Sequence, residues 1–185
     1  MIIETERLIL REWKKSDVDS MATINQDPKV MEFFPSTRSY AETEKFIDGN
    51  IRAYEKYGYC LYAVELKEGH KFIGFVGLNY TDFAAHFTPA VEIGWRLGSQ
   101  FWGKGYATEG AKAALDYGFK KCGLKEIVSF TVPTNVRSIR VMEKMGLKLD
   151  GNFAHPQLPA DHPLSQHVLY CLTKADYLHK VQETI

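Results

Sequence analysis

A strand that leads directly into a glycine-rich loop and then into a helix constrains most strongly what this chain can fold into. Residues 91–98 read VEIGWRLG, and residues 98–108 read GSQFWGKGYAT. Small apolar residues follow at helical spacing up to Cys122. Gly103 and Gly105 let the backbone approach an anion closely, and the N–H groups that open the next helix carry the positive end of its dipole. The stretch predicts an anion-binding loop at a strand-to-helix turn, with a plain glycine-rich turn as the alternative.

The same stretch comes close to the phosphate loop of nucleotide hydrolases, G-x-x-x-x-G-K-[ST]. Gly105 stands where that loop needs a Ser or Thr hydroxyl to hold magnesium. The dinucleotide fingerprint G-x-G-x-x-G fails as well, because Thr108 occupies its third glycine position. A pyrophosphate bound without a metal fits the loop better, which leaves a nucleotidase as the weakest functional hypothesis.

Composition narrows the classes of partner. The 185 residues include 23 Lys+Arg and 23 Asp+Glu, so net charge favours neither nucleic acid nor an anionic membrane as a partner. No apolar run approaches the roughly 20 residues of a membrane helix. Glu4 and Glu6 argue against a basic signal-peptide start, and the three scattered cysteines favour reduced thiols. We expect a single domain over residues 1–185, in the cytoplasm, as a monomer or homodimer.

Periodicity divides the chain into strands and helices. Strands are expected over residues 7–13, 59–66, 72–80, 91–98, 126–132, 147–153 and 167–173. Helices are expected from Ser16 and Asp17 to just before Pro28, and over residues 41–57, 107–122 and 136–145. Strands dominate the first half and strand–helix units the second, which predicts a mixed α/β fold.

A second motif follows the expected strand over residues 126–132. Asn135 stands where the chain leaves the sheet, within TVPTNVRSIRVMEKMGL. Gln100-x-x-Gly103-x-Gly105, between a strand and a helix, resembles the acyl-coenzyme A loop of the GNAT N-acetyltransferases. The pattern N-x-x-S-x-x-x-x-x-K-x-G-L that starts at Asn135 is similar to their second coenzyme-binding segment. The opening ETERLILRE and the pairing of Asn135 with Ser138 most resemble the RimJ/RimL-type branch.

The resemblance implies a GNAT fold: a single central, mostly antiparallel sheet, splayed at the fourth and fifth expected strands and flanked by helices. Acetyl-coenzyme A would be the co-substrate, with no metal. The backbone of Trp95, Arg96 and Leu97 would pair with the pantetheine amides, and Gly94 could supply a bulge there. Asn135 would bond the pantetheine arm, so its removal would weaken binding with little effect on stability. The remaining implied contacts are Gln100, Gly103, Lys104, Gly105, Tyr106, Ala107 and Thr108 around the pyrophosphate, with Lys104, Arg137 and Arg140 as ribose-phosphate candidates or plain solvated surface.

The expected chemistry is direct transfer of the acetyl group to a primary amine. Glu92 is the candidate base, with a structural ion pair as the alternative. The family's usual tyrosine acid is replaced by Met142, so Ser138 is the candidate acid, or a helix serine with a local backbone bond. The acceptor is a protein N-terminus or a small-molecule amine. A non-catalytic acyl-coenzyme A sensor is the competing hypothesis.

Two further sets of residues are discounted. The spacing of His155, His162 and His167 matches no metal signature, and the prolines between them indicate an ordered loop. The three cysteines lie on a helix face and in strands, where core packing is the simpler interpretation.

Overall fold

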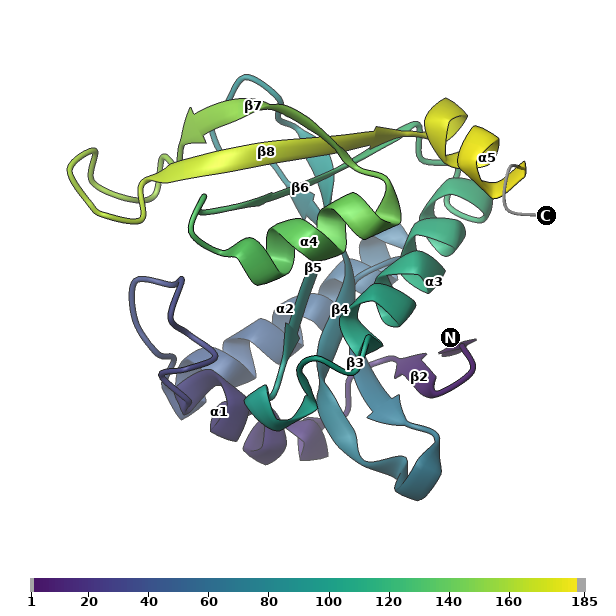
Figure 1. The fold of residues 1–185 in the computed structure, drawn as a ribbon. Coiled ribbons are helices and arrows are strands. Elements are labelled where there is room, and N and C mark those ends of the chain that lie inside the picture. The colour runs from purple at the N-terminus through teal and green to yellow at the C-terminus, as the bar shows by residue number, and fades with distance from the viewer. Residues whose placement is uncertain (1, 183–185) are drawn as a thin grey trace.

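Eight strands join into one sheet in the structure, a computed structural model that describes residues 2–182. The strand order is β1-β2-β3-β4-β5-β6-β8-β7 (Figure 1). The strands are β1 (Ile2–Glu4), β2 (Leu8–Arg11), β3 (Leu61–Leu66), β4 (Phe72–Thr81), β5 (Ala90–Leu97), β6 (Glu126–Thr131), β7 (Lys148–Ala154) and β8 (Gln166–Thr173). The helices are α1 (Val18–Gln26), α2 (Tyr40–Tyr57), α3 (Tyr106–Lys120), α4 (Val136–Met145) and α5 (Lys174–Gln182), with short 3₁₀ segments η1 (Lys15–Asp17), η2 (Glu68–His70) and η3 (Ser99–Phe101). None of the helices in this described part of the chain is long and apolar enough to cross a membrane.

The expected mixed α/β architecture is confirmed, and each expected strand and helix is present with small shifts at its ends. Two elements were not anticipated. β1 is too short for an alternating pattern to be visible, and it forms because the chain turns back to pair Ile2 with Arg11. α5 continues directly from β8, where the Thr173 hydroxyl accepts a hydrogen bond from the Asp176 N–H at 3.2 Å and so caps the first turn.

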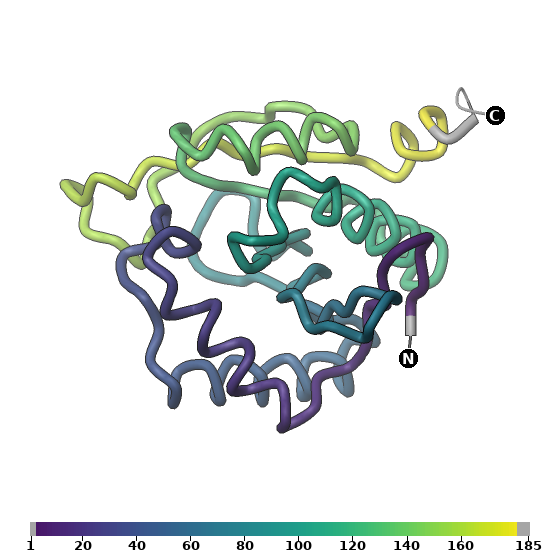
Figure 2. Tube along the Cα trace, turned by 60° about the horizontal axis from the view of Figure 1, so that its bottom comes forward, coloured from purple at the N-terminus to yellow at the C-terminus, as the bar shows by residue number. Residues whose placement is uncertain are grey.

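The sheet carries helices on both faces (Figures 1 and 2). Alternation along each strand gives the sheet two packed faces, because successive side chains point to opposite sides. Val76 of β4 belongs to the core that packs against α3 and α4, and its neighbour Phe75 to the core that packs against α1 and α2. Ile93 of β5 lies in the first of these two cores. We call the other side, with Phe75, the α1–α2 face.

The sheet changes character between β5 and β6. All other neighbouring strands are antiparallel, whereas these two are parallel and in register at Glu92 and Val128. The Ser129 hydroxyl donates to the Ile93 carbonyl at 2.9 Å just beyond that pair. Figure 1 shows the two strands running at an angle to each other. The expected splay between the fourth and fifth predicted strands is therefore confirmed.

The expected bulge at Gly94 is wrong. The register between β4 and β5 continues without a shift from the Gly74–Leu97 pair to the Thr81–Ala90 pair. The splay therefore comes from the divergence of β6, and β5 remains a regular strand along its β4 side.

Candidate active site

The loop between β5 and α3 has the backbone shape that the glycine pattern predicted. Gly103 and Gly105 have φ angles of 75° and 81°, in the left-handed region where other residues are strained. The first hydrogen bond within α3 runs from the Glu109 N–H to the Gly105 carbonyl at 3.0 Å. The N–H groups of residues 106–108 precede that bond and point out of the helix end. This arrangement favours a bound anion.

The N-terminal segment holds this loop in place. The Arg7 guanidinium donates to the Lys104 carbonyl at 3.0 Å and to the Glu109 carboxylate at 2.7 Å. The Thr5 hydroxyl donates to the same carboxylate at 2.6 Å, and Arg7 also lies over the Tyr106 ring at 4.7 Å. Burial alone would raise the pKa of Glu109, but the bonds from Thr5 and Arg7 outweigh it and lower the pKa. The N-terminal segment ETERL thus has a structural role. Thr5 and Arg7 fix the loop, and Arg7 compensates the negative charge of Glu109.

The free edge of β5 offers backbone groups to a ligand at alternate residues. The Gly98 N–H donates to a β4 carbonyl at 3.0 Å, and antiparallel alternation then directs the backbone groups of Arg96 toward β4 as well. The groups of Trp95 and Leu97 point the other way, into the splay. The Leu97 carbonyl accepts from the Trp102 indole at 2.8 Å. A pantetheine contact by the Arg96 backbone is therefore a wrong expectation, while Trp95 and the Leu97 N–H are suitably placed.

The first turn of α4 is built around Asn135. Its side-chain oxygen accepts from the Ser138 N–H at 3.3 Å, and its amide donates to the Thr131 hydroxyl at 3.0 Å. Asn135 thus caps α4 and fastens the helix to the end of β6. Its amide retains a second N–H for a ligand. Met142 is 1% exposed and packs into the core, so that position offers no side chain to the splay.

Replacing Asn135 separates the capping role from a ligand contact. Asn135→Ala should lower the free energy of unfolding by about 1 kcal/mol through loss of the cap, which corrects the expectation of nearly unchanged stability. Asn135→Ser retains a capping oxygen but loses the amide and its bond to Thr131, so it should lose less stability than Asn135→Ala and bind coenzyme A about 1 kcal/mol more weakly. Denaturation and titration calorimetry measure the two effects. Unchanged affinity in Asn135→Ser would leave Asn135 as a cap alone.

Glu92 lies at the closed end of the splay, on the α1–α2 face. It is partly exposed, adjacent to Val128 in β6 and opposite Asn79 in β4. Burial raises its pKa to about 7, and a hydrogen bond from the Asn79 side chain opposes the rise. A carboxyl group that titrates near neutral pH is well suited to general base catalysis. Asn135 and Ser138 lie further out, beyond the end of β6. The glycine loop follows β5, so the loop and the Asn135 segment lie on opposite sides of the splay.

The basic candidates differ in their surroundings. Arg137 of α4 donates to Glu32 at 3.0 Å and lies over the Trp102 ring at 4.4 Å. It therefore joins α4 to the segment between α1 and α2 and to the glycine loop. Lys104 lies 6.0 Å from the centre of the Phe101 ring. The remaining candidates, Gln100 and Arg140, are exposed.

Two of the thiols and two of the imidazoles are packed among other side chains. Burial raises the pKa of Cys60 and of Cys171 to about 12, which disfavours the nucleophilic thiolate. His155 and His167 lie with ring centres 5.1 Å apart beside Phe153, and burial lowers the pKa of both imidazoles. Over residues 2–182 no three metal-ligating side chains gather into a possible site.

The side chain of Arg96 was missed from the sequence, where only its backbone was considered. It is 7% exposed and lies on the same face of β5 as Glu92, four residues away. The sequence did carry a signal for it. Glu92 and Arg96 are two charged residues on one face of an otherwise apolar strand, and such a strand is normally buried, so charged side chains on it indicate a functional site.

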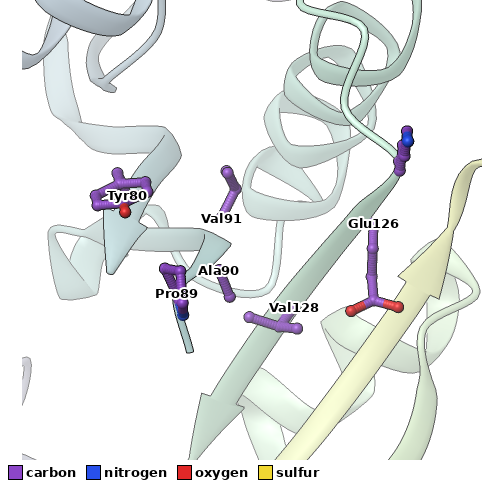
Figure 3. A pocket seen from close by; sticks show the side chains of 7 residues that line it. Tyr80, Pro89, Ala90, Val91, Glu126 and Val128 are labelled. Atoms are coloured by element: carbon purple, nitrogen blue, oxygen red, sulfur yellow. The ribbon is translucent and has the colours of Figure 1, made fainter. Parts of the chain in front are cut away.

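A recess of about 250 Å³ lies at the opposite end of the β5–β6 contact (Figure 3). Figure 3 shows Pro89, Ala90 and Val91 on one side of it and Val128 and Glu126 on the other. The recess therefore adjoins the closed end of the splay and is lined mainly by apolar side chains.

The sequence and the fold of this chain are similar to those of known acetyltransferases. Residues 7–148 match the family described as acetyltransferase (GNAT) domain. The uncharacterized N-acetyltransferase YnaD of Bacillus subtilis (strain 168) is 33% identical over 154 residues, which are 83% of this chain and 86% of that protein. An acetyltransferase (GNAT family) from Bacillus anthracis has a TM-score of 0.78 and 29% identity, over 95% of this chain and 99% of that chain. The fold is shared with RimL, a ribosomal L7/L12 alpha-N-protein acetyltransferase in complex with coenzyme A (TM-score 0.76, 20% identity, 94% and 98% covered).

Proposed function

The chain belongs to the GNAT acetyltransferase family and is an acyltransferase, and we propose that it transfers the acetyl group of acetyl-coenzyme A directly to a primary amine. The observation that carries the proposal is the splay between β5 and β6, with an anion-binding loop at its open end and Glu92 at its closed end. The pyrophosphate would lie on the N–H groups of residues 103–108. The pantetheine arm would then extend along Trp95 and past Asn135, with the thioester near Glu92.

The proposed reaction is a single displacement. The amine nitrogen bonds to the thioester carbonyl carbon, the carbon–sulfur bond breaks, and coenzyme A leaves as a thiolate. Glu92 takes the proton that the amine gives up, directly or through a water molecule, and its pKa near 7 suits that role at neutral pH. Ser138, in the first turn of α4, would orient or protonate the leaving sulfur.

We assign the chain to the RimJ/RimL-type branch of the family. The pairing of Asn135 with Ser138 supports this assignment, because the structure connects the two residues through the α4 cap. The Thr5–Arg7 contacts to the loop support it as well, since they account for the opening ETERL. A protein N-terminus and a small-molecule amine are both compatible with this branch.

A thiol-release assay tests the proposal. Purified protein with acetyl-coenzyme A and a panel of amines should release free coenzyme A thiol only when an acceptor is present, and the acceptor should gain 42 Da, roughly the mass of an acetyl group in place of a proton, by mass spectrometry. Tight coenzyme A binding without thiol release for any amine would favour the sensor. Magnesium-dependent stabilisation by ATP, without coenzyme A binding, would favour the nucleotidase.

A further inference from the structure

The buried side chain of Arg96 lies in a site that holds it from several directions. Its Nη1 donates to the Asn25 side-chain oxygen at 2.7 Å. Asn25 is fully buried and is fixed in turn by a bond from its amide to the Thr43 hydroxyl at 3.0 Å. The guanidinium lies 4.2 Å from the centre of the Phe34 ring and 5.4 Å from that of Phe75. Its position is thus fixed by α1, β4 and the α1–α2 connection.

Within residues 2–182, no acidic side chain forms an ion pair with Arg96. Its Nε is buried and has no hydrogen-bond partner among the described residues. The ionised side chain that shifts the pKa of Arg96 is another cation, Arg38, which lies after Phe34 in the segment between α1 and α2. Burial, and after it Arg38, lowers the pKa of Arg96 to about 9. The surroundings therefore disfavour the charge that the residue carries at neutral pH.

Arg11 shows how this protein treats a buried arginine that serves the fold. Its Nη1 and Nη2 each donate to Asp17 at 2.8 Å, and its Nε donates to Glu65 at 2.7 Å. Two carboxylates thus neutralise one guanidinium, and the pKa of Arg11 is raised. Arg96 has the same burial without either acid, and burying an unpaired charge is costly.

Arg96 and Glu92 lie on the same face of β5. Gly94, the residue between them on this face of β5, has no side chain, and a Leu61 methyl group lies 3.6 Å from where its Cβ would be. Four residues of strand separate their Cα atoms by roughly 13 Å, and the long Arg96 side chain can shorten that span. A molecule lying along β5 could present one end to Glu92, an apolar middle to Leu61 and its other end to Arg96.

We infer that the acceptor amine carries a carboxylate, several bonds from its nitrogen, that binds the Nε–Nη2 edge of Arg96. This inference rests on the proposed function, because it places the amine at Glu92. Among the described residues only Asn25 bonds the guanidinium, through Nη1, and Phe34 lies against one face of it. The Nε–Nη2 edge therefore has no partner, and a carboxylate that displaces the side chains burying Nε would pair with it in the plane of the group. Arg38 adds a second positive charge. Polyamines would bring further positive charge to two arginines, so we expect them to be poor acceptors.

The test compares acceptors that differ only at the carboxylate. ω-Amino carboxylates of increasing chain length are assayed beside their primary amides and beside spermidine, by thiol release under steady-state conditions. A second arm uses short peptides with an acidic or a neutral second residue, so a protein source of the carboxylate can be told from a small molecule. The unmutated enzyme should use the carboxylates with kcat/KM roughly ten- to hundred-fold above the matched amides.

Three variants assign the effect to Arg96. Arg96→Met should remove the preference for carboxylates: kcat/KM should fall far more with the carboxylates than with the matched amides. Arg52→Met, which removes an exposed arginine of α2, should leave the preference intact. In urea, Arg96→Met should shift the unfolding midpoint far less than Arg11→Met, because only the latter strands two carboxylates.

Equal use of carboxylates and amides by the unmutated enzyme would overturn the inference. So would an equal loss for every acceptor in Arg96→Met, which would make Arg96 a structural residue. Absence of thiol release with every amine would contradict the proposed function itself, and the inference would fall with it. Turnover confined to peptides with an acidic second residue would support the inference and identify a protein as the source.

Discussion

Glu92→Gln is expected to lower turnover by roughly 10²-fold while the affinity for acetyl-coenzyme A stays unchanged. The amide retains the shape of the side chain but cannot accept the amine proton. The pH dependence has a defined sign: Glu92 acts only when ionised, and its pKa is about 7. The turnover of the unmutated enzyme should therefore fall as the pH drops below about 7, and Glu92→Gln should lose this acidic limb.

A variant of Asn79 tests the assignment of Glu92 as the base in a second way. Its hydrogen bond lowers the pKa of Glu92 against the effect of burial, so Asn79→Ala should move the acidic limb to higher pH and retain turnover on the plateau. Glu126→Gln, which removes an exposed carboxylate of β6, should leave the profile unchanged. Steady-state kinetics against pH measure all three. An acidic limb that persists in Glu92→Gln would make Glu92 structural and assign the proton to solvent or another group.

Gly105→Val is expected to abolish measurable binding of coenzyme A. The φ angle of 81° is strained for any L side chain and most for a β-branched one. An added Cβ would also lie 3.4 Å from the Arg7 guanidinium that holds the loop, so relief of the strain would disturb the N–H groups that face the pyrophosphate. Titration calorimetry on the folded variant measures the loss.

Gly49→Val is the control for this change. Gly49 lies in α2, where an added Cβ meets nothing within 4 Å and φ is not positive. That variant should bind coenzyme A normally, with only a small loss of stability from the β-branched side chain. Wild-type affinity in a folded Gly105→Val protein would contradict the assignment of the loop to the pyrophosphate.

The features that the sequence predicted best are those encoded locally. The glycine loop and the start of α4 were visible because a left-handed turn needs glycine and a helix start needs a capping side chain. The regular periods of β5 and α3 marked the strand and helix that flank the loop.

What the sequence did not reveal depends on contacts between distant residues. Glu109 meets Thr5 and Arg7 only because β2 and α3 are neighbours in the fold. The sequence of β5 could not predict that Arg96 lacks an acidic partner either. That property depends on the residues that α1 and the segment between α1 and α2 place beside it. Arg11 has a comparable sequence setting and is fully paired.

The alternation of β5 has an evolutionary consequence. Its even-numbered residues Glu92, Gly94 and Arg96 face α1 and α2, while Trp95 and Leu97 direct their backbone groups into the splay and their side chains toward α3. Acceptor and cofactor would thus be recognised by different residues of a single strand. Substitutions at the even positions and on the α1–α2 connection can then change which amine is used, while the cofactor contacts persist. Descendants of one ancestral enzyme could in this way diverge in acceptor without passing through a form that has lost acetyl-coenzyme A.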